Sequence, residues 1–321
     1  MQAKLSRVVV TLAALGTASC AYGPFAPEPE AEPVIALCRD RTIHTKPFRH
    51  STISVRDAES IVHVPEDDNL WIGDDHSRAV FEFDRRSGHY RSRLTEEEIV
   101  EEFPEVERCE DGDRNPETRC SYTGELEVLA YDPGTETLFV FNTVSDWSQR
   151  PPEDKAALFR LRKKHAHADF GLFDWRKIPA GLRIGPAVAI GGRLYLAIGG
   201  DVIEYDVERN QLADVDAAGD PLPVVSIASG NHIVGMAFDG ASLWLLTGRK
   251  QLVQVYWDSK AVIESYDIAP FGIGKAKGLA FGEGEFFVVD GDYPNLIHVL
   301  RFGTRAKISW WRGGGQSLSC G

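Results

Sequence analysis

The sequence predicts an all-β fold, a β-propeller built from four-stranded antiparallel blades. Short apolar runs recur along the chain and alternate with acidic or glycine-bearing turns, a pattern typical of antiparallel strands. One apolar triplet, usually with an aromatic residue at its centre, returns five times, at Leu70–Ile72, Leu138–Val140, Leu194–Leu196, Leu243–Leu245 and Phe286–Val288. The copies begin 43 to 68 residues apart, and repeats of this length with four short strands each indicate propeller blades.

Each triplet is expected to be the second strand of a blade. The expected first strands are Ile61–Val64, Val128–Tyr131, Ala187–Ile190, Val234–Phe238 and Leu279–Phe281. The expected fourth strands are Tyr90–Leu94, Leu172–Ile178, Val224–Ile227, Val262–Tyr266 and Ile308–Trp311. One such unit cannot bury both of its faces, so the units must stack around an axis. We expect five blades, with six as the alternative, in a ring closed near the two termini; a two-sheet sandwich would not explain the recurring triplet.

The N-terminal residues have the layout of a secretory signal. Lys4 and Arg7 precede the apolar run Val8–Leu15, and small residues then lead to Cys20. The apolar run is too short to span a bilayer as a helix. Residues 1–20 therefore predict a signal peptide that ends at a lipoprotein-like cysteine, with a lipid attached to Cys20. Ordinary cleavage after Ala21 is the alternative.

Proline and glutamate dominate residues 21–34, a composition that cannot bury a core and predicts an extended tether. Residues 35–321 are then the single propeller domain, with an insertion at residues 95–124. This insertion is expected to begin with a short helix, because Thr95 and Glu98 have the spacing of a capping box. We expect an exported protein of the cell envelope, in contact with the membrane through a lipid anchor only, or else a periplasmic or extracellular protein.

The five cysteines fit export. If Cys20 carries a lipid, four cysteines remain that can pair in an oxidising compartment. We expect Cys109–Cys120, which would close a short polar loop, and Cys38–Cys320, which would join the two ends of the ring. The sequence has no Cys-x-x-Cys pair among these four, and this argues against a zinc site.

The net charge of the chain is -13. A strongly acidic protein is repelled by the phosphate backbone, so nucleic acid is not an expected partner. The basic run Arg160–Asp169 is small beside this overall charge. The expected partner is a protein or a small molecule.

In a propeller, sites form where the inner strands begin and where the loops after the second strands open onto the central channel. Glu59 and Glu127 occupy equivalent positions, each eleven residues before its triplet. Allowing for shorter turns, the corresponding positions hold Gly185, Val234 or its neighbour Ile233, and Lys277. The candidate ligand residues at this mouth are Glu59, Asp74, Asp75, His76, Glu127, Asn142, Asp201, Arg249, Lys277, Asp290 and Asp292.

A hard cation such as Ca²⁺ prefers six to eight oxygen ligands and tolerates irregular geometry. The residues expected to bind it are Glu59, Glu127, Asn142 and Asp290. The alternative is that these residues are ordinary turn residues, and that Lys277 neutralises the two glutamates as a charge cluster.

The layout resembles propellers related to the NHL-repeat, gluconolactonase/regucalcin and SdiA-regulated families. The resemblance extends from Asp57 to about Phe302 and is carried by Asp57–Glu59, Leu70–Asp75, Val80–Asp84 and Gly88. In lactonase members, a glutamate of the first inner strand binds a divalent metal together with an asparagine and an aspartate of later blades. The resemblance implies these roles for Glu59, Asn142 and Asp290, although Glu-Ser-Ile stands here in place of the Glu-Gly-Pro of those families.

The sequence contains no Gly-x-Ser-x-Gly elbow, no His-Glu-x-x-His motif and no phosphate-binding loop. It therefore favours a non-catalytic binding module without a required cofactor. The alternative is a Ca²⁺-dependent hydrolase, similar to a lactonase or esterase, with its site at the channel mouth.

Overall fold

The computed structural model describes residues 35–45, 55–104, 126–142, 157–163, 170–178, 184–227 and 231–304. These residues belong to one compact unit, Val34–Gly321, and a separate unit, Met1–Pro33, lies outside the described residues. The predicted signal peptide, the lipidation of Cys20, the tether and the Cys109–Cys120 loop also lie outside them. None of the described helices is long and apolar enough to span a membrane.

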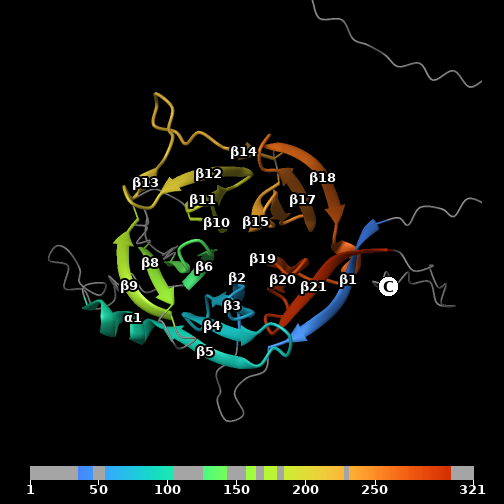
Figure 1. Ribbon diagram of the computed structural model, residues 1–321, viewed down its shortest axis with the longest axis horizontal. Helices are drawn as coiled ribbons and strands as arrows, with labels where there is room; N and C mark the ends of the chain where they lie inside the picture. The colour runs from blue at the N-terminus through green and yellow to red at the C-terminus, as the bar shows by residue number, and fades with distance from the viewer. Residues whose placement is uncertain are drawn as a thin grey trace, which may run out of the picture. The chain divides into compact units, whose positions relative to one another are not determined.

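Five antiparallel sheets are arranged in a ring around a central axis (Figure 1), so the all-β prediction and the five-bladed ring are confirmed. Blade 1 contains β2 (Ala58–Val64), β3 (Asn69–Asp74), β4 (Ala79–Asp84) and β5 (Tyr90–Thr95). Blade 2 contains β6 (Leu126–Asp132), β7 (Thr137–Asn142), β8 (Ala157–Lys163) and β9 (Phe170–Lys177). Blade 4 contains β15 (Ile233–Phe238), β16 (Ser242–Thr247), β17 (Gln251–Tyr256) and β18 (Ala261–Asp267).

Blade 3 departs from the regular pattern at its outer edge. Its inner strands are β10 (Ala187–Ile190), β11 (Arg193–Ile198) and β12 (Asp201–Asp206). The fourth strand is split into β13 (Gln211–Leu212) and β14 (Val225–Ser226), and both pieces pair with β12. The prediction of a continuous strand over Val224–Ile227 is therefore only partly right, because the chain between the two pieces leaves the sheet.

Blade 5 closes the ring. It contains β19 (Ala276–Gly282), β20 (Glu285–Asp290), β21 (Leu296–Thr304) and, on the outside, β1 (Ile35–His44). The predicted fourth strand at Ile308–Trp311 lies outside the described residues. The fourth place in this blade is taken by β1, which pairs with β21 from Ile35 opposite Thr304 to His44 opposite Leu296. Closure near the termini is thus confirmed, and the N-terminal segment supplies the strand that closes the ring (Figure 1).

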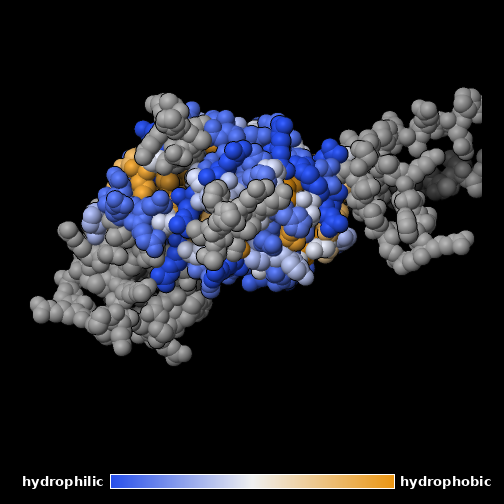
Figure 2. Space-filling model, turned by 90° about the horizontal axis from the view of Figure 1, so that it is seen from below, coloured by the Kyte–Doolittle hydropathy of each residue, from blue (hydrophilic) through white to orange (hydrophobic). Residues whose placement is uncertain are grey.

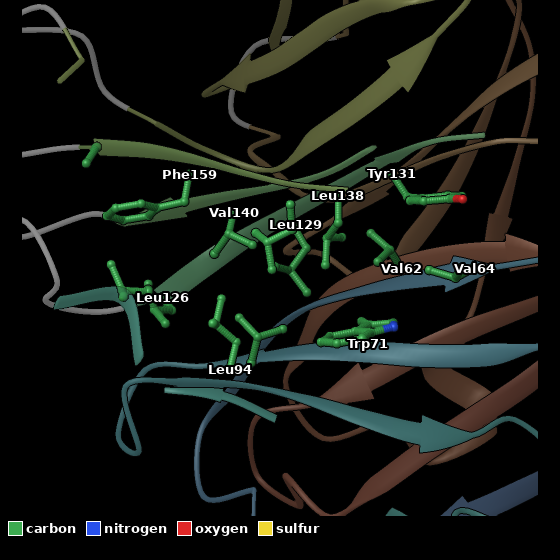
Figure 3. Packing of buried hydrophobic residues seen from close by; sticks show 14 residues of the cluster. Val62, Val64, Trp71, Leu94, Leu126, Leu129, Tyr131, Leu138, Val140 and Phe159 are labelled. Atoms are coloured by element: carbon green, nitrogen blue, oxygen red, sulfur yellow. The ribbon is translucent and has the colours of Figure 1, made fainter. Parts of the chain in front are cut away.

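The second strand of every blade is buried on both faces. In blade 1 the central Trp71 packs toward blade 2, where it meets Leu129 and Leu138 (Figure 3). Its neighbours Leu70 and Ile72 point the other way and pack with residues of blade 5. This alternation follows from the two-residue period of a strand.

The same alternation holds around the ring. The central residues Phe139, Tyr195, Trp244 and Phe287 each pack in the interface with the following blade, and for Phe287 this blade is blade 1. The five hydrophobic clusters of the described residues are therefore the five interfaces between neighbouring blades. A continuous apolar triplet, rather than an alternating one, is what such a strand requires.

The predicted helix is present as α1 (Glu96–Glu102). The Thr95 hydroxyl accepts a hydrogen bond from the Glu98 backbone N–H, and the Glu98 carboxylate accepts one from the Thr95 backbone N–H, so the capping box is confirmed. Ile99 is fully buried and joins the cluster between blades 1 and 2, with Phe103 packed against it. The rest of the predicted insertion lies outside the described residues.

An ion-pair network supports the closing strand. Glu285 of β20 accepts two hydrogen bonds from the Arg41 guanidinium of β1, at 2.5 and 2.9 Å, and one from Arg85 of blade 1, at 2.7 Å. Arg85 also pairs with Asp68 of blade 1. One carboxylate therefore links the closing strand, the last blade and the first blade.

Cys38 lies in β1 and is buried at the same closure. Its predicted partner, Cys320, lies outside the described residues, so this disulfide stays a prediction.

We expect Glu285→Gln to lower the free energy of unfolding by about 2–3 kcal/mol, because it leaves the buried Arg85 and the partly exposed Arg41 without a shared carboxylate. Urea unfolding at neutral pH measures this difference. The matched control is Glu283→Gln, an exposed glutamate in the β19–β20 turn, which should change the value by less than about 0.5 kcal/mol. Equal, small effects of the two substitutions would contradict a role for Glu285 in closure.

Candidate functional site

The central channel opens into a cavity of about 430 Å³ at the end where the first strands begin. Glu59, Glu127, Val234 and Lys277 line this mouth, and residues Gly185 to Ala187 line it from blade 3. The slots that the sequence predicts to face the channel thus do converge. We refer to this cavity as the channel mouth.

A backbone irregularity presents these side chains to the channel. In four of the five blades the pairing register between the first and second strands shifts at the mouth residue: between Ala58 and Ser60, Leu126 and Val128, Ile233 and Gly235, and Ala276 and Leu279. The residues skipped in these shifts include Glu59, Glu127, Val234 and Lys277. A bulge of this kind places one additional residue outside the regular alternation and re-aims its side chain.

Four apolar residues lie between the mouth and a second cavity, and we refer to them as the apolar throat. Ile61, Ala187, Met236 and Leu279 line both the mouth and a second cavity of about 240 Å³ at the opposite end. Each comes from a first strand of a different blade. The throat therefore lies between the charged channel mouth and the second cavity, which is lined largely by apolar residues.

Glu59 and Lys277 form an ion pair across the junction of blades 1 and 5, with the ammonium donating to the carboxylate. Burial raises the pKa of Glu59, and the opposing hydrogen bond from Lys277 does not cancel this effect. Burial acts to lower the pKa of Lys277, but the hydrogen bond and the negative charges of Glu59 and Asp57 outweigh it, so the pKa is raised. The negative charge of the nearby Asp57 contributes to raising both pKa values.

Three carboxylates converge beside this pair. One oxygen each of Asp57, Glu59 and Asp75 lies within 4.8 Å of the others, and all three residues are half-buried. Carboxylates this close repel one another unless a cation lies near them. Lys277 provides one such cation, and a divalent metal ion is the other kind of group that this arrangement could hold.

The structure does not bring the four expected metal ligands together. Asn142 and Asp290 are the last residues of β7 and β20, are fully buried, and are not among the described residues that line the channel mouth. Glu59 and Glu127 do line it.

Asp74 and Asp290 fill the same structural position in their blades. Asp74 accepts hydrogen bonds from the backbone N–H groups of Arg56, Asp57 and Ser77. Asp290 accepts them from Gly274, Lys275 and Asp292. Each carboxylate holds the segment that enters the first strand of its blade, so these acids position the mouth residues without facing the channel.

The other predicted mouth residues lie away from the cavity lining. His76 is exposed with a ring nitrogen 3.3 Å from the Arg56 guanidinium, and the exposed Asp201 accepts a hydrogen bond from the Ser226 hydroxyl at 2.6 Å. Arg249 is exposed in the β16–β17 turn, where its neighbour Lys250 faces the cavity instead. Asp292 is exposed and donates its backbone N–H to Asp290.

Three cationic or titratable residues of the mouth were not predicted from the sequence, namely His232, Lys250 and Lys275. Lys275 precedes the strand whose bulge presents Lys277 to the channel, and because the bulge interrupts the regular alternation, strand periodicity could not have indicated that both face the channel. No sequence pattern distinguishes Lys250 from Arg249 in the same turn, because the turn conformation decides which of the two side chains faces inward.

Fold and site together define a five-bladed β-propeller with a charged channel mouth. A comparison with models of known protein families finds no match, and no curated protein sequence matches either. Among solved structures, the chain is similar to the glutaminyl cyclase of Myxococcus xanthus, with 12% identity and a TM-score of 0.50 over 86% of this chain and 100% of that chain. It is also similar to the PQQ-bound aldose sugar dehydrogenase of Streptomyces coelicolor, with 12% identity and a TM-score of 0.49 over 84% of this chain and 98% of that chain. At these identities the likeness concerns the fold alone.

The buried Asp290 gives a pH-dependent prediction. Burial acts to raise its pKa, but the three backbone N–H hydrogen bonds favour the charged form and hold the pKa below its usual value. A carboxylate with a depressed pKa contributes stability above its unfolded-state pKa of about 4, and loses it as the pH falls through the folded-state value.

We expect Asp290→Asn to lower the free energy of unfolding by about 1–3 kcal/mol at pH 7, because one of its two accepting oxygens becomes an amide nitrogen. The gap between the native protein and the variant should begin to shrink below about pH 4, where the carboxyl group becomes protonated in the unfolded chain, and it should close as the pH falls through the lower pKa of the native carboxyl group. Urea unfolding at pH 7 and pH 3 measures both values. A gap of equal size at the two pH values would show that the charge of Asp290 does not matter.

Proposed function

We propose that this chain is an exported, membrane-tethered binding module that holds a small polar ligand in the channel mouth. The observation that carries the proposal is a cavity of about 430 Å³ into which bulges in four blades present charged or apolar side chains. Cavities that bind small ligands are typically about 300–1,000 Å³, with a few convergent polar groups on apolar walls. Val128, Leu129 and Met236 form part of the apolar wall.

The exposed residues favour a small molecule, rather than a protein with a broad interface, as the ligand. The side shown in Figure 2 is mostly hydrophilic, and the hydrophobic residues on it form small, separate patches. None of the large exposed hydrophobic residues in the described part of the chain lines the channel mouth. Protein interfaces are centred on contiguous apolar patches more often than on scattered residues.

Export and membrane attachment rest on the N-terminal sequence. Basic residues, a short apolar run and Cys20 follow one another in the order expected of a lipoprotein signal, and the acidic, proline-rich tether comes next. Lipid attachment can be tested separately from ligand binding. Cells that produce the native protein or Cys20→Ser are labelled with a radioactive fatty acid, and the label should appear in the native protein and not in the variant.

A second candidate function is a Ca²⁺-dependent hydrolase. The observation that favours it is the convergence of Asp57, Glu59 and Asp75 within 4.8 Å, since carboxylate oxygens are the ligands that Ca²⁺ prefers. The ion pair between Glu59 and Lys277 argues against it, because a metal ion would have to displace or repel the ammonium group. We therefore place ligand binding first.

We expect Val234→Trp to abolish binding of any small molecule that binds the channel mouth, because the bulged Val234 lines the cavity and an indole would occupy it. The matched control is Val262→Trp, the same change at an exposed position in the outer strand of the same blade. The measurement is a thermal-shift screen of amino acids, carboxylates, amines and neutral sugars with the native protein and both variants. Ligands whose thermal shifts survive Val234→Trp would refute a site in the channel mouth.

For the second candidate we expect Ca²⁺ at one hundred times its Kd to stabilise the native protein by about 2.7 kcal/mol. Asp75→Asn should remove this effect, whereas Asp292→Asn, which changes an exposed carboxylate outside the cluster, should retain it. Calorimetric titration with Ca²⁺ measures the binding directly. No heat and no change in melting temperature would exclude the hydrolase of this type.

A further inference from the structure

The charged residues of the channel mouth are sorted by sign around the ring. The acidic ones, Glu59 and Glu127, come from blades 1 and 2, with Asp57 and Asp75 beside Glu59. The basic or titratable ones, His232, Lys250, Lys275 and Lys277, come from blades 4 and 5. Blade 3 contributes Ile184, Gly185, Pro186 and Ala187, which carry no charge. A ligand in the cavity therefore meets acidic side chains from blades 1 and 2 and basic side chains from blades 4 and 5, and the two groups adjoin at the ion pair of Glu59 and Lys277.

The basic side of the mouth has more ammonium groups than its one ion pair neutralises. Lys277 pairs with Glu59, whereas neither Lys250 nor Lys275 forms an ion pair with another residue in the described part of the chain. Both line the cavity from different blades. Two ammonium groups in one cavity favour an anionic group of a ligand, although the charge of Lys275 is also attracted by Glu59.

The acidic side has the opposite preference. Three carboxylates converge at Asp57, Glu59 and Asp75, and Lys277 contributes one ammonium group to them. This side therefore favours a cationic group of a ligand.

Between and below the two charged sides lies the apolar throat of Ile61, Ala187, Met236 and Leu279. A group that enters it from the mouth leaves water and meets aliphatic side chains, which favours an uncharged, apolar substituent. The mouth thus offers three environments in one cavity: basic, acidic and apolar.

We propose that the channel mouth binds a zwitterionic ligand of the α-amino-acid type with an apolar side chain. Its carboxylate lies at Lys250 and Lys275, its ammonium group faces the acidic side, and its side chain enters the throat. This inference rests on the proposed function, since it names the ligand class of the same cavity.

Leucine is the probe, and calorimetric titration with leucine and two related compounds tests which charges matter. N-Acetylleucine keeps the carboxylate but not the ammonium charge, and leucinamide keeps the ammonium charge but not the carboxylate. We expect leucine to bind and each analogue to bind at least about tenfold more weakly, the loss expected for one charge-assisted hydrogen bond. N-Acetylleucine binding as tightly as leucine would overturn the zwitterion proposal and indicate a site for simple anions.

Lys275→Gln tests the placement of the carboxylate. Lys275 is exposed at the mouth, so the variant should fold normally. It should weaken leucine binding about tenfold or more and leave leucinamide binding within about twofold. The control, Lys260→Gln, changes a lysine of the β17–β18 turn that lies over the Trp257 ring and outside the cavity lining, and it should leave both affinities unchanged. Equal loss for leucine and leucinamide in Lys275→Gln would refute the assignment.

The plug variant Val234→Trp separates this inference from the proposed function. If a sugar, an amine or a simple carboxylate binds in a way that Val234→Trp abolishes while leucine does not bind, the channel site stands and the zwitterion proposal falls. If no compound binds in a way that Val234→Trp affects, both fall.

Discussion

The constraint on which the structure depends is the burial of each second strand on both faces. The central Trp71 packs against one neighbouring blade and Leu70 with Ile72 against the other, so a blade with one missing neighbour would expose a whole apolar face to water. Only a closed ring gives every blade two neighbours. The pairing of β1 with β21, supported by the shared carboxylate of Glu285, completes the last blade and lets Phe287 pack with blade 1 as Trp71 packs with blade 2.

The channel follows from this closure. Because five first strands surround one axis, residues far apart in the sequence, such as Glu59 and Lys277, become direct partners. In four blades a bulge interrupts the regular pairing of the first strand with the second, and the residue left out of the pairing directs its side chain into the channel. The buried Asp74 and Asp290 hold the segments that lead into those strands. The buried Asp74 and Asp290 therefore stabilise the backbone, whereas Glu59 and Glu127 line the cavity, although all four are acidic residues at or near strand ends.

The sequence predicted the blades well because the apolar triplets are a local pattern with a fixed meaning, and even the slots of Glu59, Glu127 and Lys277 followed from their distance to the triplet. It did not predict β1 as the closing strand, because the pairing of Ile35–His44 with Leu296–Thr304 is a contact between chain ends that no local pattern encodes. It also could not separate Asp290, which accepts backbone hydrogen bonds, from a residue facing the channel. Lys250 was missed since the turn conformation, and not its sequence, decides which side chain faces the mouth.

Native-state amide hydrogen exchange tests the central claim most directly, namely that β1 completes the ring on which all blades depend. The amides of β1 paired with β21 should exchange with the same opening free energy as those of the inner strands β2 and β15, because loss of the closing strand would remove the support of the whole ring. Rapid exchange in β1 while β2 and β15 remain protected would show that the ring is stable without β1 and would contradict a role for β1 in holding it closed.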